Sequence, residues 1–111
     1  MDVQFEIRKT NYGKYHFSLI APNGKTILTS VLFETKDKAE KRLQYVKMHA
    51  TIDDNYKRKC NGKNYGHFIF TSGDGHRICQ SDAYSSAANM EKAIEYVKAN
   101  APSARVKDFT I

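Results

Sequence analysis

Four side chains in the second half of the sequence are of the types that bind zinc: Cys60, His67, His76 and Cys79. Zinc sites are usually built from close pairs of ligands that enter one tetrahedron. Only His76 and Cys79 are so close, and they follow a turn and enter a predicted strand in which Cys79 faces the core. We therefore expect no metal site and no cofactor, and we interpret Cys79 as a small buried hydrophobe.

Patterns typical of catalysis are also missing from the sequence. No Ser or Cys nucleophile stands in a recognisable arrangement with a His base. The run Gly73-Asp74-Gly75 precedes a predicted strand, whereas a phosphate-binding loop precedes a helix. The adjacent carboxylates Asp53 and Asp54 lie in a predicted linker, where solvation explains them. We therefore predict a protein that is not an enzyme and has no catalytic residues.

The basic residues are the strongest sign of a partner. The chain has 18 Lys and Arg against 12 Asp and Glu, a formal charge of +6, which favours polyanions or acidic protein surfaces. Two clusters stand out, one between positions 57 and 63 and one on the first predicted helix. The candidate contacts with an acidic partner are Lys57, Arg58, Lys59, Lys63, Lys38, Lys41 and Arg42. The alternative is that the first cluster protects an edge strand against pairing, or is simply solvated.

Two histidines are candidates for a contact surface on a sheet. His16 and His67 each alternate with a phenylalanine, Phe17 and Phe68, so both are expected on the sheet face that the helices leave open. Such a face binds single-stranded nucleic acid in other proteins, usually through stacking aromatics that are not evident here. The alternatives are a solvated face and a dimerising one.

An internal repeat organises all of these residues. A shift of 51 residues aligns 15–50 with 66–101, and 11 of the 36 positions are then identical. Chance would give about two or three matches between sequences of ordinary composition. The identical pairs are His16/His67, Phe17/Phe68, Gly24/Gly75, Ile27/Ile78, Ser30/Ser81, Glu40/Glu91, Lys41/Lys92, Tyr45/Tyr96, Val46/Val97, Lys47/Lys98 and Ala50/Ala101. We interpret the chain as a tandem duplication.

Each repeat is predicted to form a strand, a hairpin and a helix. Apolar residues first alternate, then pass a turn at Asn23-Gly24 or Asp74-Gly75, and then recur with a helical period. Residues 104–111 are expected to add a last strand. The predicted fold is α+β: two tandem βββα(β) repeats share one largely antiparallel sheet, with two helices on one face. We expect a single domain, 1–111, made of repeat 1 (1–51) and repeat 2 (52–111).

Two runs carry a resemblance to a known family. Asn23-Gly24-Lys25-Thr26-Ile27-Leu28-Thr29-Ser30 and Val97-Lys98-Ala99-Asn100-Ala101-Pro102 stand at corresponding places in hairpin-plus-helix units. The chain resembles the YegP-like family of small bacterial and archaeal proteins. The resemblance implies β3αβ units joined in one sheet, with the C-terminal strands exchanged between repeats. It implies no activity and no site residue, because members of the family are uncharacterised.

These observations favour a non-catalytic binding module with an acidic macromolecular partner, either nucleic acid or protein. The alternative is a protein-protein or self-association module that uses the open face or a sheet edge, and a small-molecule enzyme is the least favoured class. The N-terminus lacks the basic start and apolar stretch of a secretory signal, and no run approaches the ~18 apolar residues of a membrane span. We expect a cytoplasmic protein without membrane contact, and a monomer with internal pseudo-dimer symmetry.

Overall fold

The computed structural model describes residues 3–60 and 66–110, and of Cys60 only the backbone. Its first half contains β1 (Gln4–Lys9), β2 (Tyr15–Ile20), β3 (Thr26–Ser30) and α1 (Lys36–His49). Its second half contains β4 (Tyr56–Cys60), β5 (Gly66–Thr71), β6 (Arg77–Gln80), α2 (Ala87–Asn100) and β7 (Arg105–Asp108). Two 3-10 turns, Asp53–Asn55 and Ala101–Ser103, follow the helices.

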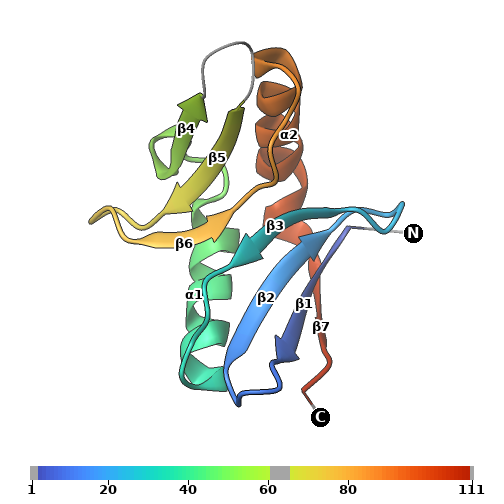
Figure 1. The fold of residues 1–111 in the computed structure, drawn as a ribbon, viewed down its shortest axis with the longest axis vertical. Helices are drawn as coiled ribbons and strands as arrows, with labels where there is room; N and C mark the ends of the chain where they lie inside the picture. The colour runs from blue at the N-terminus through green and yellow to red at the C-terminus, as the bar shows by residue number, and fades with distance from the viewer. Residues whose placement is uncertain (1–2, 61–65, 111) are drawn as a thin grey trace.

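All seven strands form one sheet in the order β4-β5-β6-β3-β2-β1-β7. Every pair is antiparallel except β1 and β7, which are parallel. Both helices lie on one face of the sheet, α1 against β2 and α2 against β5 (Figure 1). The predicted α+β fold is confirmed, with one mixed sheet. Strand β7 follows the second helix but pairs with the first half, as expected for an exchanged C-terminal strand.

The two halves meet where β3 pairs with β6. Thr29 lies opposite Gln80, and these two residues are 51 positions apart. Residues related by the repeat therefore face each other across the centre of the sheet, as they would around a twofold axis. The turns obey the same relation, because Gly24 and Gly75 have φ angles of 87° and 89°. That left-handed conformation strains other residues, which explains why both repeats keep glycine there.

The identity of Ser30 and Ser81 also has a structural reason. The Ser30 hydroxyl accepts a hydrogen bond from the Phe17 amide at 2.9 Å, and the Ser81 hydroxyl accepts one from the Phe68 amide at 2.9 Å. Each hydroxyl also donates to the carbonyl of the next residue. Both serines are buried, so each hydroxyl satisfies a strand amide that water does not reach.

Replacing Ser81 with alanine is expected to lower the free energy of unfolding by about 1–3 kcal/mol, because the buried Phe68 amide loses its partner. Urea denaturation measures the change. Ser103→Ala is the control, since Ser103 is exposed and its hydroxyl makes only a 3.5 Å contact with the Asn100 carbonyl. Equal losses in the two variants would contradict the role assigned to Ser81.

Each helix begins at a side-chain cap and packs through an apolar stripe. Thr35 caps α1 by accepting from the Lys38 amide, and Ser86 caps α2 by accepting from the Asn89 amide. The buried stripes are equivalent in the repeat. They consist of Ala39, Leu43 and Val46 on α1, and of Met90, Ile94 and Val97 on α2.

One hydrophobic core contains residues of both halves. Simple alternation places Ile27 and Ile78 on the open face, but both are buried members of this core. The reason is a register shift in each hairpin, between Leu19 and Ile20 and between Phe70 and Thr71, which breaks the strict alternation beside them.

Candidate functional site

The sheet has an open face, which we define as the face opposite the helices. Residues that lie opposite each other in register share a face, so the strand pairings define a row of residues across it. The row consists of Lys57, Ile69, Gln80, Thr29, Ser18, Glu6 and Lys107. It crosses all seven strands and has charged residues at both ends and neutral ones in the middle.

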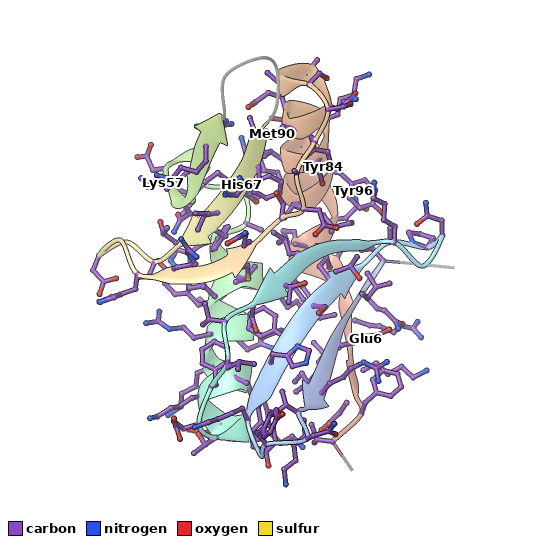
Figure 2. All side chains as sticks on the ribbon, in the orientation of Figure 1. Glu6, Lys57, His67, Tyr84, Met90 and Tyr96 are labelled. Atoms are coloured by element: carbon purple, nitrogen blue, oxygen red, sulfur yellow. The ribbon has the colours of Figure 1, made fainter. Side chains whose placement is uncertain are left out.

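The open face is strongly basic. The strand residues that the register places on it include six cations and one carboxylate, Glu6. The cations are Lys57 and Lys59 on β4, Arg77 on β6, Arg8 on β1, and Arg105 and Lys107 on β7. The cations of β4 lie at one end of the sheet and those of β1 and β7 lie at the other, where Figure 2 shows Lys57 and Glu6 far apart. The face therefore has two positive ends.

Glu6 is held by its own neighbours. Gln4 Nε2 donates to Glu6 Oε2 at 2.8 Å, and Arg8 Nη2 donates to Glu6 Oε1 at 2.9 Å. Burial opposes ionisation, but these hydrogen bonds and the charges of Arg8 and Lys107 outweigh it and lower the pKa of Glu6. The only carboxylate among the strand residues of the open face is thus ionised and paired.

The cluster at positions 57–63 is divided by the alternation of β4. Lys57 and Lys59 lie on the open face, while Arg58 points the other way and donates to Glu91 at 2.7 and 3.0 Å and to Asp53 at 2.9 and 3.3 Å. Arg58 is therefore neutralised by two carboxylates that also lie outside the open face. Lys63 lies outside the described residues.

The network around Arg58 ties the second half together. Lys98 on α2 donates to Asp53 Oδ1 at 2.8 Å. Hydrogen bonds from Arg58 and Lys98 lower the pKa of Asp53 to about 2. Asp53, for which the sequence indicates only solvation, thus joins β4 to α2.

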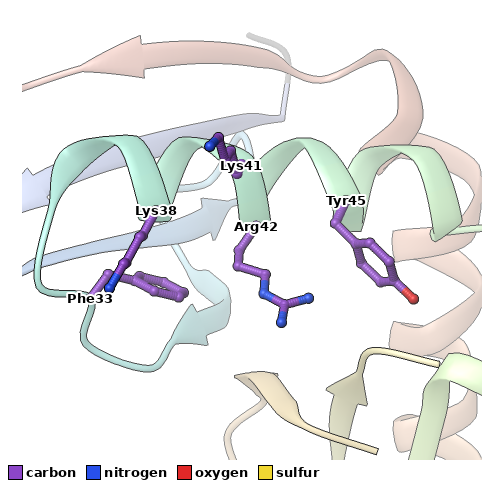
Figure 3. Close-up of a pocket in the computed structure, with 5 residues that line it drawn as sticks. All are labelled: Phe33, Lys38, Lys41, Arg42 and Tyr45. Carbon is purple, nitrogen blue, oxygen red and sulfur yellow. The ribbon is translucent and has the colours of Figure 1, made fainter. Parts of the chain in front are cut away.

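The second basic cluster lies on α1, in the helix layer. Lys38, Lys41 and Arg42 line a hollow of about 530 Å³ together with Phe33 and Tyr45 (Figure 3). The two basic clusters therefore do not converge on one face.

Several of the α1 cations already have partners within the chain. Lys41 pairs with Asp37 at 3.0 Å, and Lys36 pairs with Asp108 of β7. Lys47 donates to the Ala104 carbonyl at 2.7 Å. Lys36 and Lys47 therefore attach the C-terminal segment to α1, and the charge of Lys41 is balanced by a carboxylate on the same helix.

Tyr45 has a structural role at the edge of the helix layer. Its hydroxyl accepts hydrogen bonds from the Gly73 amide at 2.9 Å and from Asn55 Nδ2 at 3.3 Å, and its ring stacks on His49. Tyr45 thus joins α1 to the β5–β6 hairpin of the other half. Tyr96, its equivalent on α2, is half-buried against the core.

The two candidate histidines lie in equivalent places on the open face. His16 lies opposite Arg8, and His67 lies opposite Lys59, so each imidazole has a cation beside it. His16 is half-buried, and its Nδ1 atom is buried without a hydrogen-bond partner among the described residues. Burial, reinforced by the charge of Arg8, lowers the pKa of His16 below 6.5.

The folded protein is expected to lose stability as the pH falls through about 6.5, the ordinary pKa of His in the unfolded chain. In that range the unfolded state binds a proton at His16 that the folded state binds less readily, so stability rises with pH. His16→Gln is expected to flatten this dependence between pH 7.5 and about 5.5. Urea denaturation at several pH values tests it, and an unchanged slope in the variant would contradict it.

The metal-type residues are dispersed. Cys79 is fully buried, and burial raises the pKa of its thiol, while His76 is exposed and contacts Asp74 at 2.8 Å. Within the described parts of the chain, no three His, Cys, Asp or Glu residues come together as metal ligands would. The side chain of Cys60 lies outside the described residues.

Neither helix in the described part of the chain combines the length and the apolar character that crossing a bilayer requires.

Comparison with known proteins decides the family. The family model described as "Domain of unknown function (DUF1508)" matches residues 11–56 and again residues 61–108. The chain belongs to the DUF1508 family. The two matches correspond to the two repeats, and the resemblance to YegP-like proteins is confirmed. A UPF0339 protein of Pseudomonas aeruginosa is 33% identical to this DUF1508 chain over 108 residues, covering 97% of the chain and 98% of the relative.

Relatives with solved structures have the same fold. The UPF0339 protein YegP of Escherichia coli K12 is 38% identical over 108 residues, which cover 96% of each chain. The solution structure of E. coli YegP matches this DUF1508 chain with a TM-score of 0.89 at 34% identity, covering 99% of the chain and 95% of that structure. A UPF0339 protein of Shewanella oneidensis matches with a TM-score of 0.90 at 28% identity, covering 99% and 93%. The family is described as one of unknown function, so it supplies no residue roles.

Sequence reasoning missed four of the six open-face cations: Arg8, Arg77, Arg105 and Lys107. None of them lies in a dense cluster along the chain. Alternation with Ile7 is the signal that could have identified Arg8. The positions of Arg105 and Lys107 depend on the register of β7 against β1, and the strand exchange that the resemblance implies does not give that register.

Proposed function

We propose that this DUF1508 protein is a non-catalytic binding module whose open face receives nucleic acid. The supporting observation is the charge of that face, where six cations oppose one carboxylate. The net charge of these seven residues is +5, and the formal charge of the whole chain is +6. A nucleic acid that binds such a surface releases its condensed counterions into the bulk solution, and this release favours binding.

Protection of edge strands does not explain the whole pattern. The edge strands are β4 and β7, so that alternative covers their four cations. Arg77 lies on β6 and Arg8 on β1, and both of these strands have neighbours on each side. Charge in the interior of the sheet supports a binding surface.

Nucleic acid fits this face better than an acidic protein does. Protein interfaces have a core rich in aromatic and other apolar side chains, whereas the row across this face holds a single apolar residue, Ile69. From β4 to β7 the row spans six strand spacings, about 29 Å, which suits a long chain of phosphates.

Binding should depend on phosphates more than on bases. Phe109 lies beside the face, but the guanidinium of Arg8 is 4.0 Å and the ammonium of Lys107 is 5.2 Å from its ring centre. The ring is thus occupied by cations, and apart from the imidazoles of His16 and His67 the strand residues on this face offer no aromatic side chain for stacking. We expect little sequence preference.

Fluorescence anisotropy with a labelled single-stranded 20-mer tests the proposal. Binding is expected at low salt, and log K should fall with log salt with a slope of about −4 if all six cations contact phosphates. No binding at about 20 mM salt, or a slope near zero, would contradict the proposal. Polyglutamate is the competitor, and displacement as effective as that by unlabelled oligonucleotide would assign the face to acidic proteins instead.

A further inference from the structure

The two halves carry equivalent hollows on the open face. The hollow of the first half has a volume of about 420 Å³, and that of the second half about 390 Å³. We call them the first and the second pocket. The shift of 51 residues pairs six of their lining residues: Glu6 with Lys57, Arg8 with Lys59, Ser18 with Ile69, Ile20 with Thr71, Gly24 with Gly75, and Thr26 with Arg77. The same backbone frame thus holds two different sets of side chains.

The charges of the two pockets differ. In the first pocket Arg8 is paired with Glu6 at 2.9 Å, so these charges cancel. The second pocket has three cations, Lys57, Lys59 and Arg77, and no carboxylate in its lining. Across the described residues, none of the three forms an ion pair.

The nearest carboxylate along the chain does not compensate for these cations. Asp74, in the hairpin next to Gly75, accepts hydrogen bonds from Ser72 and from the His76 ring. These bonds lower the pKa of Asp74 to about 2 and hold its carboxylate within the turn. The second pocket therefore concentrates positive charge that the chain itself leaves unbalanced.

An unpartnered hydroxyl is the second, independent sign of a ligand. Thr71 lines the second pocket and is only 6% exposed, and its Oγ1 has no hydrogen-bond partner among the described residues. A buried hydroxyl without a partner costs free energy, and the first pocket avoids that cost with Ile20. A rotation of 120° about χ1 moves Oγ1 to another staggered position, and an oxyanion in the pocket that Thr71 lines would be an acceptor for this hydroxyl.

We infer that the second pocket binds one tetrahedral oxyanion of the phosphate type. Arg77 offers a planar fork of N–H donors, Lys57 and Lys59 supply charge, and the Thr71 hydroxyl donates the remaining hydrogen bond. The inference rests on the proposed function in one respect, since it makes this pocket the place where the open face holds a backbone phosphate. Free inorganic phosphate presents the same oxygens.

An NMR titration of the ¹⁵N-labelled protein with inorganic phosphate, at constant ionic strength, tests the site. Amide shifts are expected at the pocket residues of β4, β5 and β6. Arg77→Thr and Thr71→Ile copy the residues that the first half holds at the equivalent positions, so the fold already accommodates them. We expect Arg77→Thr to raise the Kd for phosphate about tenfold and Thr71→Ile about threefold.

Lys38→Asn is the matched control, because it also removes one cation by copying the equivalent residue, Asn89. Its Kd for phosphate should stay within about twofold of the wild type, since the charge lies in the helix layer. Shifts spread over the whole surface, or equal losses in Lys38→Asn and Arg77→Thr, would overturn the inference.

The same variants, titrated with the labelled 20-mer, separate this inference from the proposed function. Localised phosphate binding without oligonucleotide binding would support the pocket and contradict the nucleic-acid proposal. Oligonucleotide binding that survives Arg77→Thr unchanged, with no localised phosphate shifts, would support the proposed function and overturn the pocket.

Discussion

Replacing Phe17 or Phe68 with alanine is expected to lower the free energy of unfolding by about 3–5 kcal/mol. Both rings are fully buried and occupy equivalent places. Phe17 stacks on Phe33 with ring centres 6.1 Å apart, and Phe68 stacks on Tyr84 at 6.3 Å. Each alanine would leave a cavity in the core that the two halves share, so either variant should weaken the whole domain.

Urea denaturation followed by both circular dichroism and tyrosine fluorescence measures the loss and its extent. Each variant should unfold in one transition, at the same urea concentration for both signals. Tyr12→Ala is the control, since Tyr12 is 91% exposed, and it should change the free energy by less than about 0.5 kcal/mol. A two-step curve in either phenylalanine variant would contradict the prediction that residues 1–111 form a single domain.

The helices and hairpins of this fold could be predicted from the sequence because the duplication repeats the residue pattern of each one. The turns at Gly24 and Gly75 need a left-handed backbone, and this requirement leaves a matching glycine in both repeats. The helical stripes follow from the spacing of apolar residues, and they agree between α1 and α2. Local chemistry and periodicity therefore sufficed to predict the helices and hairpins.

Features that depend on strand pairing could not be predicted from local chemistry and periodicity. The parallel pairing of β7 with β1 is a contact between the two ends of the chain, and no local pattern encodes it. Ile27 and Ile78 leave the expected face because of register shifts that alternation does not predict. For the same reason the sequence offers no sign that Arg77 lies beside Lys57 and Lys59.

The separation of Arg58 from Lys57 and Lys59 could have been predicted from the sequence. Lys57, Arg58 and Lys59 are consecutive residues of a predicted strand, and consecutive residues of a strand point to opposite faces. Treating them as one cluster overlooked that Arg58 points away from its two neighbours, toward Glu91 and Asp53. The density of charge along a sequence thus differs from its density on a surface.

Removing charge from the open face is expected to weaken oligonucleotide binding far more than removing the same charge from α1. The open-face variant carries Lys59→Gln, Arg105→Gln and Lys107→Gln, which lie at both ends of the sheet. Three lost phosphate contacts should reduce the affinity about 30-fold and make the salt slope shallower by about 2. All three residues are exposed, so the fold should tolerate the changes.

The helix-layer variant carries Lys38→Gln, Lys41→Gln and Arg42→Gln. Each variant loses three cations, so both have a formal charge of +3 instead of +6. The Debye length at 0.1 M salt is about 10 Å, so charges in the helix layer are largely screened from a ligand on the other side of the sheet. This variant should therefore lose less than about threefold in affinity.

The direct comparison of these two variants, by anisotropy with the labelled 20-mer at about 0.1 M salt, tests the central claim that the open face is the binding surface. The account predicts a loss of about 30-fold for the open-face variant and a small loss for the helix-layer variant. Equal losses would show that affinity depends only on the net charge of the chain. A larger loss in the helix-layer variant would show that the binding surface lies on α1. Either result would contradict the claim.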